Sequence, residues 1–255
     1  MLKPKKALGQ NYLFNPILLT RILDAAEITR EDLIVEIGPG PGRMTESLAQ
    51  RAQQVIAIEL DAELYARLRQ ELAGYFNLEL VHMDALDYPF ESLPPFKVVA
   101  NIPYYITTPI IFRLLEARTR LRSMTLTIQK EVAERIVAPP GGKDYGVLSL
   151  AVQYRAVPSL CFTVAREEFR PVPKVDSAVL RMDMRVKPPV EVSDEKMLFR
   201  VIKTAFAQRR KTLSNALKPL VPESRDILLK AGIDPQRRAE TLSIEDFARI
   251  ANLLS

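Results

Sequence analysis

The feature that most restricts the fold is an alternation of short aliphatic runs with helical patterns through the first half of the chain. Between two of these runs, Leu64, Leu68 and Leu72 recur every four residues, as they do on one face of a helix. Strands that alternate with helices form βαβ units, and such units build a mostly parallel sheet. The runs that we predict to be its strands are Leu33–Ile37, Val55–Glu59, Leu78–His82, Lys97–Asn101 and Met124–Ile128.

The second half of the chain has a different pattern. Two further strand candidates, Leu160–Val164 and Ser177–Met184, follow one another without a clear helix, so we expect an antiparallel hairpin at the sheet edge. Lys187–Pro189 then marks a linker, and only helical periodicity follows it. The sequence therefore predicts an α/β fold with a Rossmann-like sheet in residues 1–187 and a small all-α domain in residues 188–255.

The chain has 36 basic and 31 acidic residues, and most of its net charge of +5 lies near the C-terminus. Residues 186–255 hold 13 basic and 9 acidic residues, which is +4 of that total. No acid interrupts the seven basic residues between Glu195 and Glu223, which are Lys196, Arg200, Lys203, Arg209, Arg210, Lys211 and Lys218. They could form a solvated helix face, or a surface that binds the phosphates of a nucleic acid.

Other features argue against a secreted, membrane or metal-binding protein. The one cysteine, Cys161, cannot form an internal disulfide, and we expect it in the core. The longest uncharged stretch, Val98–Phe112, is shorter than the about 18 apolar residues of a membrane span. The basic residues near the N-terminus lead into the polar segment Gly9–Asn11 instead of an apolar signal run. The only histidine, His82, is expected to be structural. We therefore predict a cytoplasmic protein with no metal site and no membrane contact.

A glycine-rich loop, Glu36–Gly42, follows the first predicted strand, and glycines there let a ligand approach the backbone closely. Glu59 ends the second strand, where a carboxylate can accept hydrogen bonds from both hydroxyls of a ribose. Asp84 follows the third strand and can accept a hydrogen bond from the exocyclic amine of a purine. The alternative is that the glycines form an ordinary tight turn between strand and helix, and that Glu59 and Asp84 are helix caps.

The charge around this loop separates two classes of cofactor. A dinucleotide pyrophosphate needs bare helix-start amides and often a basic side chain. Adenosine that carries an amino-acid sulfonium has a positive centre, which suits acidic neighbours. Because Glu36, Glu59 and Asp84 surround the loop, the sequence favours the second class.

The fourth strand ends in the motif Asn-Ile-Pro-Tyr, residues 101–104, at the sheet edge where ligands of α/β proteins bind. An aromatic amine is a poor nucleophile until acceptors hold both of its hydrogens. The side-chain carbonyl of Asn101 and the backbone carbonyl of Ile102 or Pro103 can supply those acceptors. Pro103 also restricts the turn, and Tyr104 offers a face for base stacking. The alternative is a structural strand-to-helix turn with a buried asparagine cap.

In order and spacing, eight motifs of the chain resemble those of the S-adenosylmethionine-dependent ribosomal RNA adenine dimethyltransferases. The motifs span Gly9–Leu13, Glu36–Gly42, Ile58–Asp61, Asp84–Leu86, Asn101–Tyr105, Phe169–Val179, Gln208–Leu213 and Gly232–Ser243. The resemblance implies that the first domain binds S-adenosylmethionine and transfers its methyl group, and that the second binds RNA.

The resemblance also implies a role for individual residues. Asn101 would face both the methyl donor and the target amine, next to Pro103 and Tyr104. The residues implied to contact the cofactor are Gln10, Asn11, Leu13, Gly38, Glu59, Asp84, Ala85 and Asn101. In the basic segment, Arg209, Arg210 and Lys211 are the predicted RNA-binding residues.

Two branches of the family share the catalytic half. Motifs Gln208–Leu213 and Gly232–Ser243 resemble the small-subunit branch, which dimethylates N6 of two adjacent adenosines near the 3′ end of 16S ribosomal RNA during ribosome biogenesis. The expected partner is small-subunit RNA or the assembled small subunit, bound by a monomer. The alternatives are a macrolide-resistance enzyme of large-subunit RNA, a ribosome-assembly or nucleic-acid-binding factor that lacks catalysis, and a nicotinamide oxidoreductase.

Overall fold

The computed structural model describes Lys5 and residues 9–255, which form two compact units. The first unit contains the described residues up to Ala133 together with Val157–Met184. The second contains Glu134–Ala156 and Arg185–Ser255. The sequence predicts a helical domain that begins at residue 188. In the structure an earlier segment, Glu134–Ala156, packs with these helices and is added to the second unit.

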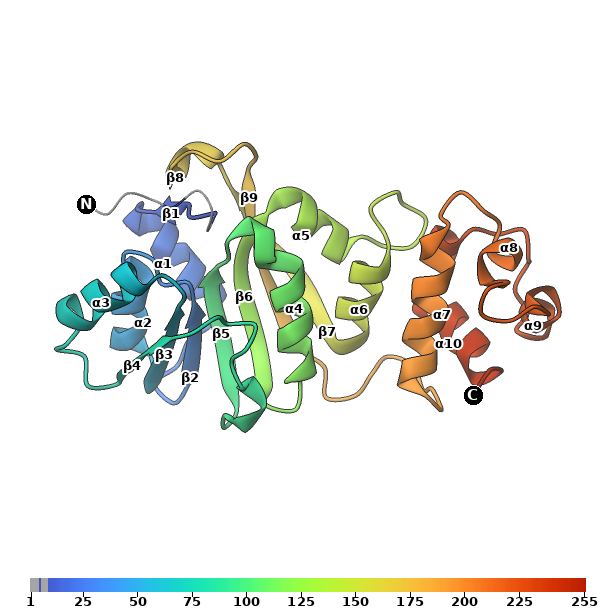
Figure 1. The fold of residues 1–255 in the computed structure, drawn as a ribbon, viewed down its shortest axis with the longest axis horizontal. Coiled ribbons are helices and arrows are strands. Elements are labelled where there is room, and N and C mark those ends of the chain that lie inside the picture. The colour runs from blue at the N-terminus through green and yellow to red at the C-terminus, as the bar shows by residue number, and fades with distance from the viewer. Residues whose placement is uncertain (1–4, 6–8) are drawn as a thin grey trace. The chain divides into compact units, whose positions relative to one another are not determined.

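The first unit is built on a seven-stranded sheet with the strand order β4-β3-β2-β5-β6-β9-β7 (Figure 1). Strands β2 to β6 pair in parallel, and β9 runs antiparallel to β6 next to the edge strand β7. This confirms the predicted fold class. The strands are β2 (Leu33–Ile37), β3 (Gln54–Glu59), β4 (Leu78–His82), β5 (Phe96–Asn101), β6 (Leu121–Gln129), β7 (Ala156–Val164) and β9 (Ser177–Met184).

The strand order determines where a ligand can bind. The chain leaves β4 at one edge and returns as β5 on the other side of β2, and this reversal opens a crevice at the carboxyl ends of the central strands. The helices of this unit pack against the sheet: α1 and α2 share one apolar cluster with β2, β3 and β5, and α4 contacts β6. They are α1 (Pro16–Ala25), α2 (Arg43–Arg51), α3 (Ala62–Glu71), α4 (Thr107–Glu116) and α5 (Lys130–Val137), which continues into the second unit.

A two-stranded sheet ties the N-terminal segment to a part of the chain far away in sequence. Strand β1 (Tyr12–Leu13) pairs antiparallel with β8 (Phe169–Arg170), and Tyr12 lies opposite Arg170. Leu13 and Phe169 are buried in the same apolar cluster as α1 and α2. The N-terminal segment is therefore held against the sheet by backbone pairing and by burial of apolar side chains.

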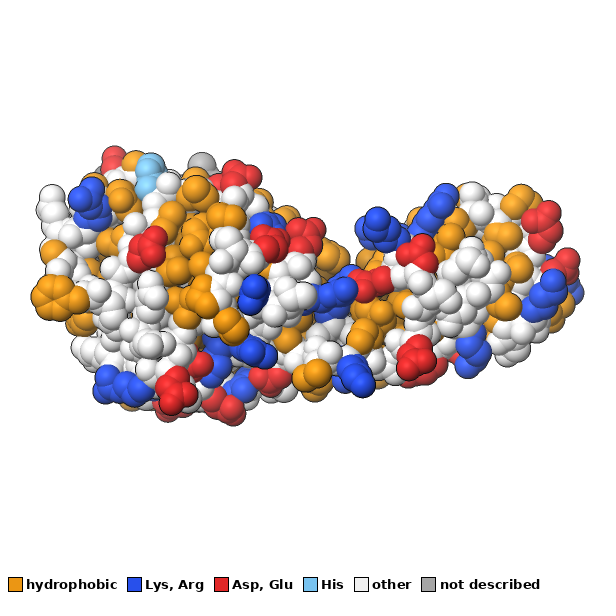
Figure 2. Space-filling model, turned by 90° about the horizontal axis from the view of Figure 1, so that it is seen from below, with side chains coloured by type: hydrophobic (Ala, Val, Ile, Leu, Met, Phe, Trp, Pro, Cys, Tyr) orange, Lys and Arg blue, Asp and Glu red, His pale blue; other side chains and the backbone are white. Residues whose placement is uncertain are grey.

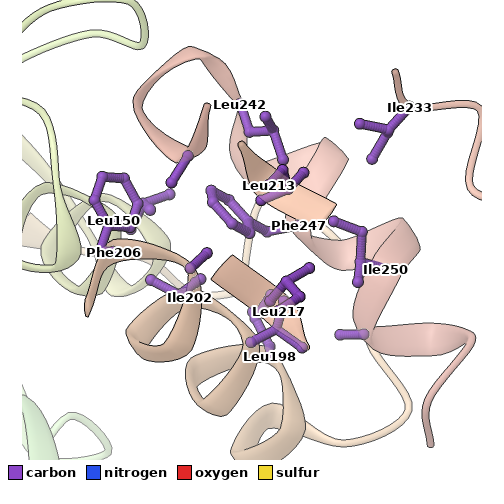
Figure 3. Packing of buried hydrophobic residues seen from close by; sticks show 14 of the residues in the cluster. Leu150, Leu198, Ile202, Phe206, Leu213, Leu217, Ile233, Leu242, Phe247 and Ile250 are labelled. Carbon is purple, nitrogen blue, oxygen red and sulfur yellow. The ribbon is translucent and has the colours of Figure 1, made fainter. Parts of the chain in front are cut away.

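The second unit is a helical bundle with its own apolar core (Figure 3). Phe206 lies at the centre of an aromatic row, with its ring centroid 6.1 Å from Tyr145 and 6.0 Å from Phe247. Leu150 of the added segment is buried in the same core, so this segment belongs to the bundle. Its helices are α6 (Val147–Arg155), α7 (Glu195–Ala207), α8 (Leu213–Leu217), α9 (Ser224–Lys230) and α10 (Ile244–Asn252). No helix in the described part of the chain is long and apolar enough to cross a membrane.

One local expectation is wrong. Cys161 is exposed and not in the core, because it lies on the edge strand β7, where neighbouring side chains also face outward. Helix α7 is capped by Asp194, whose side chain accepts a hydrogen bond from the N–H of Lys196. The last helix, α10, begins after Ser243, which forms a reciprocal capping box with Asp246.

The placement of α6 in the second unit can be tested with a cavity variant. We expect Leu150→Ala to destabilise this unit by about 2–5 kcal/mol, because the lost methyl groups leave a cavity in a close-packed core. Hydrogen exchange followed by mass spectrometry should show faster exchange in α7 and α10, and little change in the sheet. The matched control is Leu48→Ala in the first unit's cluster, for which the pattern should reverse. Faster exchange of the sheet alone in Leu150→Ala would contradict the assignment.

Candidate active site

A cavity lies at the carboxyl ends of β2, β3 and β5, where the strand order predicts a ligand site. The glycine loop, the N-terminal segment and the turn after β5 together form its wall. Pro103 and Tyr104 line it as well. Seven of the eight predicted cofactor residues line this cavity, and they are Gln10, Asn11, Gly38, Glu59, Asp84, Ala85 and Asn101.

Gly40 shows why the loop after β2 needs glycine. Its φ is +55°, which is in the left-handed region that side chains disfavour. A Cβ atom there would also lie 2.8 Å from two ring carbons of Tyr12. The ring of Tyr12 therefore packs directly on the loop, and any larger residue would separate the two.

Glu59 is held at the end of β3 by two backbone amides. One carboxylate oxygen accepts a hydrogen bond from the N–H of Asp61 at 2.8 Å, and the other accepts one from Gly40 at 3.2 Å. The side chain is buried, and this burial raises its pKa above the ordinary value even though the two amide bonds oppose the shift. Glu59 therefore joins the glycine loop to the turn after β3.

Asp61 holds the N-terminal segment over the cavity. Its carboxylate accepts hydrogen bonds from the Lys5 ammonium at 2.9 Å and from the Gln10 side-chain amide at 3.2 Å. Burial alone would raise the pKa of Asp61, but the bonds from Lys5 and Gln10 bring it below its ordinary value. Gln10 lines the cavity, and its side chain serves to attach the segment to Asp61.

Asn101 is oriented by the N-terminal segment. Its side-chain Nδ2 donates a hydrogen bond to the backbone carbonyl of Asn11 at 2.9 Å. Because the nitrogen is used in this way, the Oδ1 atom is left as the acceptor that Asn101 can offer to a ligand. The predicted acceptor for an aromatic amine therefore lies at the carboxyl end of β5.

Tyr104 is fixed at its hydroxyl end. The hydroxyl lies 2.8 Å from the Oγ of Ser177, which is fully buried on β9. Burial raises the pKa of Tyr104, so the phenol stays neutral in the physiological range. The ring is thus anchored at one end while it lines the cavity beside Asn101.

Asp84 and His82 have different positions at the end of β4. Asp84 lines the cavity and accepts a hydrogen bond from the N–H of Leu86 at 2.9 Å, through Oδ1. His82 is exposed and stacks on Tyr65 with the ring centroids 5.1 Å apart. Within the described residues, no group of three histidine, cysteine or acidic side chains could hold a metal ion.

Glu36 has an unusual environment that the sequence does not reveal. Its side chain is 1% exposed, and neither carboxylate oxygen has a hydrogen-bond partner among the residues that the structure describes. It lines a second, smaller cavity of about 30 Å³ together with Leu13, Gly38 and Asn101. Gly38 and Asn101 also line the first cavity, so the two cavities adjoin. Leu13, the eighth predicted cofactor residue, borders only the smaller one.

The three predicted RNA-binding residues differ in their surroundings. Arg209 donates hydrogen bonds to the backbone carbonyls of Lys143 (2.7 Å) and Tyr145 (3.2 Å). Its guanidinium therefore ties the end of α7 to the loop before α6. Arg210 and Lys211 are exposed in the turn between α7 and α8. On the face shown in Figure 2, basic and acidic side chains are interspersed, so this face has no extended surface of one charge.

Comparison with known proteins identifies the family. The family model described as ribosomal RNA adenine dimethylase matches residues 1–255. The ribosomal RNA small subunit methyltransferase A of Moorella thermoacetica is 48% identical, over 99% of this chain and 93% of its own length. The protein of that name from Clostridium botulinum is 45% identical, over 99% of this chain and 94% of its own length.

Two solved structures are similar over almost the whole chain. A dimethyladenosine transferase from Plasmodium falciparum has a TM-score of 0.82 and 28% identity, and the match covers 93% of this chain and 95% of that one. The 23S rRNA methyltransferase ErmE has a TM-score of 0.74 and 30% identity, with 94% and 98% covered. These matches confirm the predicted enzyme class and its methyl donor. The chain belongs to the ribosomal RNA adenine dimethylase family, whose enzymes take methyl groups from S-adenosylmethionine.

Proposed function

We propose that the protein dimethylates N6 of two adjacent adenosines near the 3′ end of small-subunit ribosomal RNA. The observation that carries this proposal is the orientation of Asn101, whose side-chain oxygen is left as an acceptor beside the cavity carboxylates. The relatives named for the small subunit are 45–48% identical to the chain, whereas the large-subunit enzyme ErmE is 30% identical. This difference supports the small-subunit branch.

The cavities suit a cationic nucleoside cofactor. S-adenosylmethionine, when bound, supplies a methyl group on a positively charged sulfur. Glu59 would accept hydrogen bonds from the ribose of the cofactor, and Asp84 would accept one from its adenine amine. Asn11, Gly38 and Ala85 would line the cavity around the cofactor. The unpartnered carboxylate of Glu36 would face its positive amino-acid end, since an ammonium group can satisfy a buried carboxylate. The unpaired group thus fits a ligand of this charge.

The turn after β5 would hold the target amine. The Pro103 carbonyl already accepts hydrogen bonds from the N–H of Ile106 and the hydroxyl of Thr107. We therefore favour the Ile102 carbonyl as the partner of Asn101 Oδ1 in binding the two amine hydrogens. Held in this way, the nitrogen directs its lone pair at the methyl group, and close positioning supplies most of the rate.

Tyr104 would hold the adenine ring after the base leaves its stack, as enzymes that modify bases require. Its anchored ring offers a flat face at low entropic cost. The second unit would bind flanking RNA through Arg210 and Lys211, which are exposed, with Arg209 positioning the loop before α6. The partner would be small-subunit RNA or the assembled subunit. Action as a monomer in the cytoplasm stays a prediction.

The first test combines substrate choice with one substitution. Wild-type protein, labelled S-adenosylmethionine and under-methylated subunits should give N6,N6-dimethyladenosine in small-subunit RNA only. Asn101→Ala should lower this transfer by at least about 100-fold, which is the usual loss when one positioned hydrogen-bonding group is removed from a transition state. The modified bases are mapped by primer extension.

Circular dichroism melting serves as the control that Asn101→Ala is folded. Transfer by this variant within a few fold of wild type would contradict the role of Asn101. Label in large-subunit RNA would favour the resistance-type enzyme. If wild-type protein transferred no label, the non-catalytic assembly factor would be the better interpretation.

From the burial of Glu36 we predict that the free energy of unfolding of the cofactor-free protein depends on pH. Burial raises the pKa of Glu36 to about 8 from 4.5. Between these values the folded protein holds a proton that the unfolded chain has lost, so stability falls as pH rises, by at most about 1.4 kcal/mol per pH unit. Below pH 4.5 the buried, protonated Glu36 contributes fully to the free energy of unfolding. Above pH 8 Glu36 no longer makes the free energy of unfolding depend on pH. Urea unfolding at pH 5, 6, 7 and 8 measures it.

Glu36→Gln should flatten this profile, because the amide cannot ionise. The matched control, Glu31→Gln, changes an exposed carboxylate before β2 and should keep the wild-type slope. Equal slopes in wild type and Glu36→Gln would show that Glu36 is ionised in the free protein.

From the exposed Arg210 and Lys211 we predict that substituting both weakens RNA binding and makes it less dependent on salt. Replacing Arg210 and Lys211 together by glutamine should weaken binding, and the slope of log affinity against log salt should fall by about 0.7–0.9 per lost phosphate contact. Cofactor affinity should stay the same. Arg209→Gln is the comparison, since it removes two bonds to carbonyls and should instead lower the stability of the second unit. An unchanged salt slope in the double variant would count against this surface.

A further inference from the structure

A groove of about 720 Å³ lies on the outer side of the glycine loop, within the first unit. The N-terminal segment contributes Tyr12 and Phe14, the start of α2 contributes Arg43, and the segment after β8 contributes Arg170 and Pro171. Its volume is in the range of pockets that hold small-molecule ligands, about 300–1,000 Å³. None of the cofactor roles above uses this groove.

The groove continues from the active site. Tyr12 lines both the groove and the cavity that contains Asn101, and its ring packs on Gly40 between them. Backbone pairing of Tyr12 with Arg170 brings the segment after β8 to the same place. A strand whose target base lay at Asn101 and Tyr104, at the edge of the cavity, has this groove beside it for a neighbouring nucleotide.

Two arginines in the groove have donors to offer a ligand. Arg43 is exposed, and its guanidinium makes no hydrogen bond or ion pair with any residue that the structure describes. The side chain of Arg170 donates from Nη1 to the carbonyls of Glu167 and Phe169. These are the only side-chain bonds it makes within the described chain, so Nη2 and Nε are left over. A third arginine, Arg67, is paired with Glu71 at 2.6 Å.

The groove also presents an aromatic ring. Phe14 is 39% exposed, although it packs edge-on against Tyr12 with the ring centroids 6.4 Å apart. An exposed but restrained ring beside unpaired arginines is the combination that binds single-stranded nucleic acid, in which bases stack on rings and phosphates bind guanidinium groups. An apolar peptide would leave the arginine donors without partners.

We propose that this groove binds the single-stranded nucleotide next to the target adenosine, with its base on Phe14 and its phosphate on Arg43 and Arg170. The proposal rests on the proposed function, because it assumes an RNA strand with one adenosine in the cavity. While one of two adjacent adenosines is methylated, the groove would hold its neighbour. The nucleotide beside the target thereby contributes to the choice of substrate.

The test uses three single variants of the full chain: Phe14→Leu, Arg43→Gln and Arg170→Gln. Two quantities are measured for each, the KM for under-methylated small subunits and the affinity for a single-stranded RNA oligonucleotide of the target sequence at several salt concentrations. Phe14→Leu should weaken oligonucleotide binding by about fivefold or more, the usual effect of losing one stacked base. Each arginine variant should reduce the salt slope by about 0.7.

Arg30→Gln is the matched control, since it removes an exposed charge before β2, at the opposite end of the strands. It should behave as wild type. Cofactor affinity is measured in parallel, because Arg43 also borders the cavity of Glu36. A parallel loss of cofactor affinity in the arginine variants would overturn the proposal.

The experiment distinguishes a wrong groove assignment from a wrong proposed function. If wild-type protein methylates small subunits but all three variants match Arg30→Gln, the groove assignment is wrong and the function stands. If oligonucleotide binding depends on the three side chains but no methyl transfer to small subunits occurs, the groove assignment stands and the function is wrong.

Discussion

The two buried carboxylates at the end of β3 hold the active site together. Glu59 accepts hydrogen bonds from the glycine loop and from the turn that follows it. Asp61 caps α3 through the N–H of Glu63 and binds both Lys5 and Gln10 of the N-terminal segment. Three parts of the chain thus meet on one short turn, and the orientation of Asn101 depends on it, because Asn101 donates to that same N-terminal segment.

Acidic and basic side chains are distributed differently around the glycine loop. Inside the cavities the ionisable side chains include Glu36, Glu59 and Asp84, which suit a cationic cofactor and would repel phosphate. Arg170 lies outside these cavities, in the groove beside the glycine loop, and Arg43 borders both this groove and the cavity of Glu36. A polyanion can therefore be attracted to the protein without competing for the cofactor site. The net charge of +5 conceals this separation.

The sequence predicted the sheet and the cavity well, for a physical reason. Buried parallel strands are continuous aliphatic runs, and their carboxyl ends share one edge, so residues that end such runs must converge. Glu59, Asp84 and Asn101 followed from this rule. The sequence did not reveal three environments that depend on how distant segments pack. Leu150 belongs to the core of the second unit, and Arg209 donates hydrogen bonds to backbone carbonyls. The buried carboxylate of Glu36 has no hydrogen-bond partner among the described residues. Local periodicity carries no information on such contacts.

The pairing of β1 with β8 has a consequence for how the enzyme matures. Tyr12 precedes its partner Arg170 in the chain by most of the first unit. During synthesis the central strands β2 to β6 can associate while strand β1 still has no strand to pair with. The backbone pairing that holds β1 forms only after β8 is available, although Asp61 can already bind Lys5 and Gln10. A nascent chain that contains every predicted cofactor-binding residue therefore still lacks one of the contacts that hold the cavity wall.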